Sequence, residues 1–150
     1  MPNNQRFDYI ASDSAWGEAS LMPYVPMTLL NNGRTINEYA LVDSGSSVNV
    51  MPYSIGTRLG FAWEDQNTAI KLTGNLASLQ AKGVVVNAQV GDSELIELVF
   101  AWARTDDAPF LLGQVNFFME FDVYFMRRSR YSTSNASDSK LSPFRHCEGV

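Results

Sequence analysis

The chain is short of the residues that carry thiol, imidazole and zinc chemistry. Its 150 residues include one cysteine, Cys147, and one histidine, His146. A lone cysteine forms no disulfide within the chain, and a zinc site needs several such ligands. Adjacent side chains rarely face each other, which disfavours a Cys–His dyad, and a Ser–His–Asp triad would have to recruit His146. If the protein is a hydrolase, carboxylates must carry its chemistry, and no metal or cofactor is expected.

Long apolar runs and basic stripes are also missing. No segment approaches the roughly 18 consecutive apolar residues of a membrane helix, and no basic-then-apolar leader begins the chain. The formal net charge is −5, and Arg127, Arg128 and Arg130 beside a serine-rich stretch are typical of a solvated edge. We therefore expect no nucleic-acid or membrane partner and a cytoplasmic location, whether the chain stands alone or is part of a longer polyprotein.

The composition favours one folded domain with polar ends. An apolar content of 45% in 150 residues suits a single core. We expect a flexible arm over 1–20, a folded domain over 21–128 and a polar, disordered tail over 129–150, because serines and threonines dominate that last stretch. Most segments between 24 and 126 have strand composition, and short helices are predicted at 53–59 and 114–121.

Local signals predict how some of these segments are joined. Asn32-Gly33 supplies the positive φ values of a type I′ hairpin turn, and Gly60 is placed to end the helix over 53–59. We expect a hairpin with a small polar tip, formed by strands at 69–73 and 79–86. A further hairpin is expected from strands at 86–90 and 95–103. Asp106 and Asp107 lack apolar surroundings and read as a solvated turn.

One carboxylate stands out, because Asp43 follows the apolar run Ala40-Leu41-Val42 and precedes Ser44-Gly45. A carboxylate at the end of a buried strand needs hydrogen bonds, a neutralising partner or a shared proton. Gly45 permits a positive φ or a close backbone approach at the turn. The plain alternative is that Asp-Ser-Gly is an ordinary polar β-turn between two strands.

The sequence around this aspartate has further marks at fixed spacing. The chain reads Ala-Leu-Val-Asp-Ser-Gly-Ser-Ser at 40–47, Val-Asn-Val-Met-Pro at 48–52, Arg-Leu-Gly-Phe at 58–61 and Phe-Leu-Leu-Gly at 110–113. This ordered set resembles the retroviral-type (retropepsin-like) aspartic proteases, over about residues 23–126. Two positions depart from that pattern, since Ser47 stands where an acid is common and Gln114 where Arg or Asp is common. The ion pair that such residues make near the dimer interface is therefore missing, which leaves dimer strength and substrate preference open.

The resemblance implies a fold, an assembly and a site. The implied fold is all-β, a closed β-barrel with one or two short helices, assembled as a two-fold homodimer. The implied activity is that of an aspartic endopeptidase acting on an extended polypeptide, with Asp43 catalytic. The residues supporting the catalytic loop are Ser44, Gly45 and Gly113. Those expected to bind substrate, in a mobile flap and in pocket walls, are Thr73, Gly74, Asn75, Leu76, Val48, Val50 and Leu112.

A single Asp-Ser-Gly per chain makes each chain half of such a site. Two carboxylates about 4 Å apart repel by about 4 kcal/mol at an effective dielectric constant near 20, so the pair keeps one proton between them. The aspartic-protease dyad is the standard example of this behaviour, and only its application to Asp43 is ours. Two alternatives stay open: a non-catalytic dimeric peptide-binding module on the same fold, and an unrelated small β-barrel in which Asp43 is a turn residue.

Overall fold

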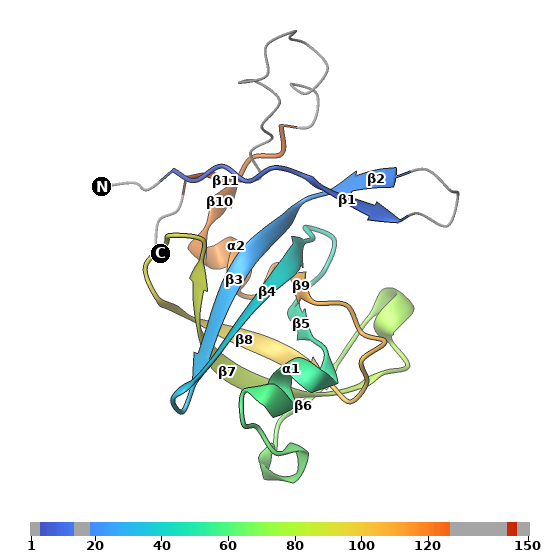
Figure 1. Cartoon of the computed structure of the whole chain (residues 1–150). Coiled ribbons are helices and arrows are strands. Elements are labelled where there is room, and N and C mark those ends of the chain that lie inside the picture. Colours follow the sequence, from blue (N-terminus) through green and yellow to red (C-terminus); the bar gives the residue numbers. More distant parts are fainter. Residues whose placement is uncertain (1–3, 14–18, 127–143, 147–150) are drawn as a thin grey trace, which may run out of the picture.

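Six strands close into a β-barrel in the computed structural model, which describes residues 4–13, 19–126 and 144–146. Their order is β3–β4–β9–β5–β8–β7, pairing between β3 and β7 closes the ring, and β6 extends the sheet beyond β7 (Figure 1). The predicted all-β barrel is confirmed. The strands are β3 (Tyr24–Asn31), β4 (Arg34–Val42), β5 (Asn49–Met51), β6 (Ala69–Lys71), β7 (Gln80–Val90), β8 (Ile96–Ala103) and β9 (Leu111–Leu112).

The β3–β4 hairpin turns where the sequence predicts it. Asn31 pairs with Arg34, which leaves Asn32 and Gly33 as a two-residue loop with φ values of 46° and 77°. Positive φ at both positions is the requirement of a type I′ turn. The hairpin aims β4 so that its last residue, Val42, precedes Asp43.

β7 is one continuous strand of 11 residues, where the sequence suggested two separate segments. Its first residues pair with β6, its later residues pair with β3, and β8 lies antiparallel along most of its length. Buried and exposed positions alternate over Val84–Val90, as expected for a strand with one face on the core. This long strand therefore links the predicted flap to the barrel wall.

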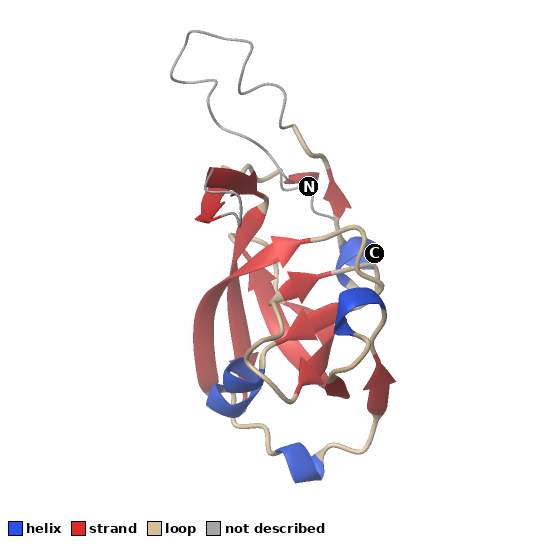
Figure 2. Ribbon diagram, turned by 90° about the vertical axis from the view of Figure 1, so that its right-hand side faces the viewer, coloured by secondary structure: helices blue, strands red, loops and turns tan. Residues whose placement is uncertain are grey.

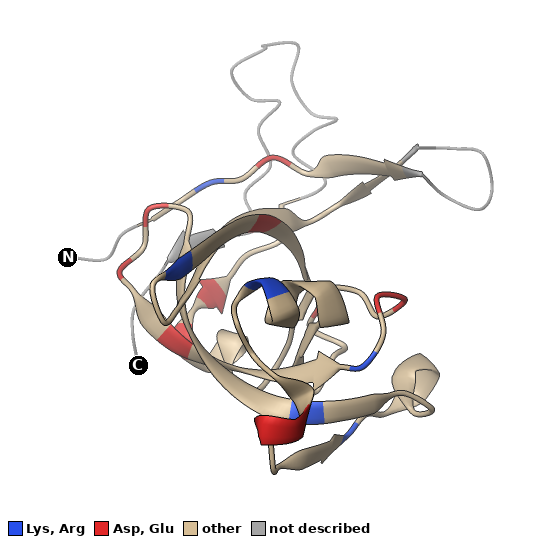
Figure 3. Ribbon diagram, turned by 60° about the horizontal axis from the view of Figure 1, so that its bottom comes forward, with Lys and Arg blue, Asp and Glu red and all other residues tan. Residues whose placement is uncertain are grey.

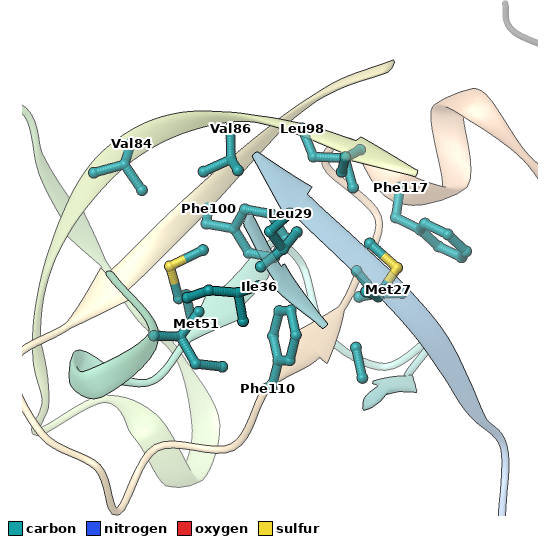
Figure 4. Close-up of a cluster of buried hydrophobic side chains, with 14 of the residues drawn as sticks. Met27, Leu29, Ile36, Met51, Val84, Val86, Leu98, Phe100, Phe110 and Phe117 are labelled. Atoms are coloured by element: carbon teal, nitrogen blue, oxygen red, sulfur yellow. The ribbon is translucent and has the colours of Figure 1, made fainter. Parts of the chain in front are cut away.

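Two apolar clusters form the core. The larger one fills the barrel, where side chains from several strands point toward one another (Figure 4). The smaller one is built from Val50, Leu72, Ala81, Ala101, Ala103, Ala108 and Leu111. It consists mostly of small residues, has partly buried neighbours such as Leu41 and Leu76, and is separate from the main core cluster.

Within the described part of the chain, four short helices lie around the strands (Figure 2): α1 (Tyr53–Arg58), η1 (Trp63–Asp65), η2 (Gly74–Leu76) and α2 (Phe117–Glu120). Gly60, with a φ of 89°, ends the first of them as predicted. α2 is shorter than the predicted helix over 114–121. The backbone N–H groups of Gln114 and Val115 donate to the carbonyls of Ser46 and Ser47, so these residues leave the helix to pair with another loop.

The N-terminus of α1 is capped by a loop far away in the sequence. Tyr53 donates its backbone N–H to the Thr105 carbonyl at 3.2 Å, and Ser54 donates its N–H to Asp106 Oδ1 at 2.7 Å. These bonds satisfy N–H groups that have no partner inside a helix. Asp106 and Asp107 lie exposed in a turn, as predicted. The Asp106 carboxylate has the additional role of joining this turn to α1.

The described ends of the chain add two small sheets. β1 (Ile10–Asp13) pairs with β2 (Ala19–Met22), and β10 (Asp122–Val123) pairs with β11 (Phe144–His146). Gln5 attaches the N-terminal segment to the barrel, accepting from the Asp92 N–H at 2.6 Å and donating to the Val90 carbonyl at 3.0 Å. The rest of the predicted tail, with Cys147, lies outside the described residues.

Charges of both signs are distributed over the described ribbon, with Lys and Arg segments interspersed among Asp and Glu (Figure 3). Arg58 and Glu38 form an ion pair at 2.8 Å between partly exposed side chains. Lys82 and Arg104 both lie over the Trp63 ring, 4.7 and 5.3 Å from its centroid. These cations therefore pack against an aromatic side chain and do not line the pocket described below. No helix among the described residues is long and apolar enough to cross a membrane.

Candidate active site

Asp43 stands at the point where two parallel strands end side by side. β4 pairs with β9 in parallel, with Val42 opposite Leu112. The Asp43 N–H then donates to the Leu112 carbonyl at 2.9 Å, which extends the pairing by one residue. The Asp43 side chain is half-buried. The carboxylate is thus carried on a fixed backbone but remains open to solvent, and is less buried than the sequence suggested.

The loop after Asp43 is held by its own hydrogen bonds. The Gly45 N–H donates to Asp43 Oδ1 at 2.9 Å, and the Ser46 N–H donates to the Asp43 carbonyl at 3.1 Å. The Ser46 hydroxyl donates to the Val48 carbonyl at 2.7 Å. Gly45 does not adopt a positive φ. Its role is close approach instead, since a Cβ there would lie 3.2 Å from Asp43 Oδ1.

A second segment, residues 113–115, braces this loop from the other side. The Gln114 N–H donates to the Ser46 carbonyl at 2.9 Å, and the Val115 N–H donates to the Ser47 carbonyl at 3.0 Å. The Gln114 side chain also donates from Nε2 to the Ser44 carbonyl at 2.8 Å. Sequence reasoning treated Gln114 only as a departure from the family pattern. Its amide in fact fixes the residue next to Asp43.

Gly113 is required by the closeness of these two segments. A Cβ at this position would lie 2.6 Å from the Ser46 carbonyl oxygen and closer still to that of Val48. Real Cβ atoms do not approach backbone oxygens so closely, so only glycine fits without a shift of backbone. The chain at Gly113 therefore passes directly against the backbone of the Asp43 loop.

A pocket of about 430 Å³ brings most of the predicted residues together. Its lining includes Asp43 and Gly45 of the Asp43 loop, Val48 and Val50, and the segment Thr73–Leu76. Ser44 and Gly113 are not among the lining residues. Six lining residues were not predicted: Leu41, Ser46, Ser47, Leu72, Pro109 and Leu111.

Leu112, predicted as a pocket wall, does not line the pocket. It is fully buried in the main core, while Leu111 lines the pocket. Successive side chains of a strand point to opposite faces, so only one of the two leucines can face the site. The same alternation places Leu41, two residues before Asp43, in the pocket, and this signal was available in the sequence.

The predicted flap is a short excursion between β6 and β7. Thr73, Gly74 and Asn75 are exposed, Leu76 is half-buried, and Gly74 has a φ of 62°. The tip is wound into tight turns, with the N–H groups of Leu76 and Ala77 donating to the carbonyls of Thr73 and Gly74. Of residues 73–76, Leu76 packs against the smaller apolar cluster and the other three are exposed. Exposed segments with few apolar contacts are those that open locally.

Neither a metal-binding cluster nor a second carboxylate is seen at this pocket. Among the described residues, no group of three or more His, Cys, Asp or Glu side chains gathers in a metal-binding arrangement. Asp43 is the one acidic residue among those lining the pocket. Within one chain, the site therefore presents a single carboxylate, a set of backbone amides and apolar walls.

Comparison with known proteins agrees with this geometry. A family model described as aspartyl protease matches residues 25–115, from β3 to the segment that braces the Asp43 loop. The chain belongs to this aspartyl protease family. A retropepsin-like aspartic protease from Rickettsia conorii has the same fold, with a TM-score of 0.53 and 15% identity over 85% of this chain and 90% of that chain. The curated proteins give no significant match.

Proposed function

We propose that this protein is a homodimeric aspartic endopeptidase in which Asp43 of two identical subunits forms the catalytic pair. The observation that carries the proposal is the placement of Asp43. It lies half-buried in a pocket that the predicted flap residues Thr73–Leu76 also line, on a loop braced by residues 112–115. Membership of the aspartyl protease family supports the same reaction class.

Two copies are needed because the reaction needs two acid–base groups. One group must take a proton from water while another donates one to the substrate. In the pocket of one chain, Asp43 is the single acidic residue among the lining residues. Ser44, Gly45 and Gln114 are exposed around this carboxylate, so the loop is accessible to a symmetric partner. A two-fold axis through this rim would bring the two carboxylates together. In that arrangement, the predicted role of Ser44 is to link the two loops through its hydroxyl.

The proposed chemistry moves protons between water, the carboxyl pair and the peptide. The ionised carboxylate takes a proton from a water molecule as the water oxygen bonds to the peptide carbonyl carbon. The protonated partner donates its proton to the carbonyl oxygen. In the second step the carboxyl that took the water proton donates it to the amide nitrogen, and the other carboxylate takes a proton from a hydroxyl of the tetrahedral intermediate. The C–N bond breaks, and the pair again holds one proton. The residues needed are the two Asp43 side chains, which a neutral amide cannot replace.

The substrate of the proposed enzyme is an extended polypeptide. The pocket lies between the flap tip and the Asp43 loop, and its wall residues Leu41, Val50 and Leu111 are apolar. An extended strand bound there makes backbone hydrogen bonds along its length and places alternate side chains in such pockets. Thr73, Gly74 and Asn75 are exposed, and their predicted role is to close over the bound substrate.

The test is proteolysis by matched variants. Asp43→Asn keeps the size and shape of the side chain but cannot act as an acid or base, so cleavage of a denatured protein mixture is expected to fall by at least about 1,000-fold. Asp107→Asn, an equal charge change on an exposed loop outside the pocket, is expected to cleave like the wild type. Equal cleavage by Asp43→Asn would overturn the proposal. If neither the wild type nor Asp43→Asn cleaves the mixture but both bind peptide, the chain is a non-catalytic binding module.

A further inference from the structure

Asn49 is a fully buried polar side chain within reach of the Asp43 loop. Only two polar side chains are classed as buried among the described residues, Asn49 at 0% exposure and Ser93 at 6%. Ser93 completes the turn between β7 and β8, outside the pocket. Asn49 begins β5, five residues after Ser44. A buried amide in a barrel wall needs a structural or functional reason, because its polar groups must all be paired.

The Asn49 carboxamide connects three backbone segments. Its Oδ1 accepts the Gly113 N–H at 2.8 Å. Its Nδ2 donates to the Val99 carbonyl at 2.9 Å and to Asn116 Oδ1 at 3.2 Å. These distances lie within the normal range for hydrogen bonds, and the 3.2 Å bond to Asn116 is at the long end of that range. One side chain thus joins β5, β8 and the segment that follows β9.

Backbone groups fix the orientation of this network. The Gly113 N–H can only donate, so the oxygen of Asn49 must face it and the nitrogen must face Val99 and Asn116. The Val99 N–H likewise donates to Asn116 Oδ1 at 2.9 Å, and Asn116 Nδ2 donates to the Glu97 carbonyl at 3.1 Å. Each amide oxygen accepts and each amide nitrogen donates. The two asparagines therefore form a network with a single consistent polarity.

Gly113 is the residue through which this network reaches Asp43. The residue before it, Leu112, offers the carbonyl that accepts the Asp43 N–H. The two residues after it donate their N–H groups to Ser46 and Ser47. An apolar residue at position 49 would leave the buried Gly113 N–H without its acceptor. The chain would then shift to find a new one, and the residues bonded to the Asp43 loop would move with it.

We propose that Asn49 is a positioning residue, which sets the place of the Asp43 carboxylate by holding the Gly113 N–H. The proposal rests on the proposed protease function for its catalytic consequence. Its structural part, that Asn49 holds the Asp43 loop, stands independently. Asn49 itself is not a lining residue of the pocket, so it acts through the backbone and does not touch substrate.

Amide hydrogen exchange tests the structural part without any assay of activity. In Asn49→Leu, exchange of the Asp43 and Gly113 amides is expected to be at least about 10-fold faster, with barrel amides such as that of Val86 less affected. Ser93→Ala is the matched control, because it removes the other buried acceptor of a backbone N–H, that of Val90. In this control the Val90 amide is expected to exchange faster and the Asp43 amide to be unchanged. Unchanged exchange at Asp43 and Gly113 in the Asn49 variant would overturn the proposal.

Kinetics of peptide cleavage test the catalytic part. Below the melting temperature of each variant, Asn49→Leu is expected to lower kcat by about 10- to 100-fold with little change in KM, because a misplaced reacting group slows chemistry more than binding. Ser93→Ala is expected to keep both constants. Loss of stability without loss of kcat would show that Asn49 is only structural.

A second variant keeps the test decisive if Asn49→Leu does not fold. Asn49→Thr places a shorter hydroxyl acceptor at the same position of β5, and its exchange rates and kcat are expected to lie between those of the wild type and Asn49→Leu. Equal exchange at Asp43 and Gly113 in Asn49→Thr and in Asn49→Val, which has the same shape without the hydroxyl, would contradict the role of the acceptor. If the wild type shows no cleavage that depends on Asp43, the proposed function fails, while the exchange experiment still decides whether Asn49 holds the loop.

Discussion

At the scale of single residues, the site depends on positions where backbone segments nearly touch. Gly113 is the clearest case, because the backbone oxygens of Ser46 and Val48 occupy the space that a side chain would need. Gly83 in β7 offers a contrast, since a Cβ there would meet the flexible end of Ile70 at 3.2 Å. A flexible side chain can move aside at small cost, whereas hydrogen-bonded backbone cannot.

We therefore expect Gly113→Ala to lower the free energy of unfolding by about 1–3 kcal/mol and to reduce cleavage with it. Gly83→Ala, the control, is expected to change stability by less than about 1 kcal/mol. Urea denaturation of both variants, followed by peptide cleavage under native conditions, measures the two effects. A Gly113→Ala protein as stable as Gly83→Ala would mean that the loop yields more easily than its contacts suggest.

At the scale of elements, α1 depends on a loop that is distant in the sequence. Pro52, the residue directly before α1, provides no side-chain cap, and Asp106 supplies the missing acceptor to the Ser54 N–H. A carboxylate at a helix N-terminus also interacts favourably with the helix dipole. The same turn carries Pro109 into the pocket wall, so this cap ties α1 to one side of the site.

Asp106→Ala is expected to destabilise the protein by about 1 kcal/mol, the usual effect of removing an N-terminal cap. For a chain of this length that lowers Tm by roughly 2–4 °C. Thermal unfolding checks the prediction, with Asp107→Ala as the neighbouring control of equal charge change. Equal Tm values for Asp106→Ala and Asp107→Ala would show that the cap does not stabilise the protein.

The elements differ in how far their sequence determined them. The sequence predicted the hairpin turn at Asn32-Gly33, the end of α1 at Gly60 and a tight turn after Asp43. Each of these features depends on residues that are close together in the chain. Three features were not predicted. The Asp106 cap and the bracing by Gln114 each depend on a contact across more than 50 residues. The presence of Leu111 in the pocket, where Leu112 was predicted, depends on the strand register. Leu41 was the exception, as simple alternation from Asp43 would have identified it.

At the scale of the whole molecule, the proposed activity belongs to a pair of chains. A mixed dimer of wild type and Asp43→Asn would contain one carboxylate and would be inactive. Adding excess Asp43→Asn to a fixed amount of wild type is therefore expected to abolish most of the cleavage, because nearly every wild-type chain then pairs with a variant. Sedimentation of the same mixtures measures how much dimer is present.

The control for this mixing experiment is an excess of Asp107→Asn, which keeps Asp43 and is expected to add activity. Cleavage that stays proportional to the wild-type chain whatever the excess of Asp43→Asn would show that one chain acts alone. A protein that sediments as a monomer throughout, with peptide bound, would lead to the same conclusion.

The parallel pairing of β4 with β9 also has a consequence for how the chain acquires its site during synthesis. The bonds from residues 112–115 complete the support of the Asp43 loop, and Gln114 is 70 positions further along the chain than its partner Ser44. A ribosome must therefore complete most of the barrel before the carboxylate is held in place. A nascent chain released before residue 110 would carry the Asp-Ser-Gly sequence without the support that makes it a site.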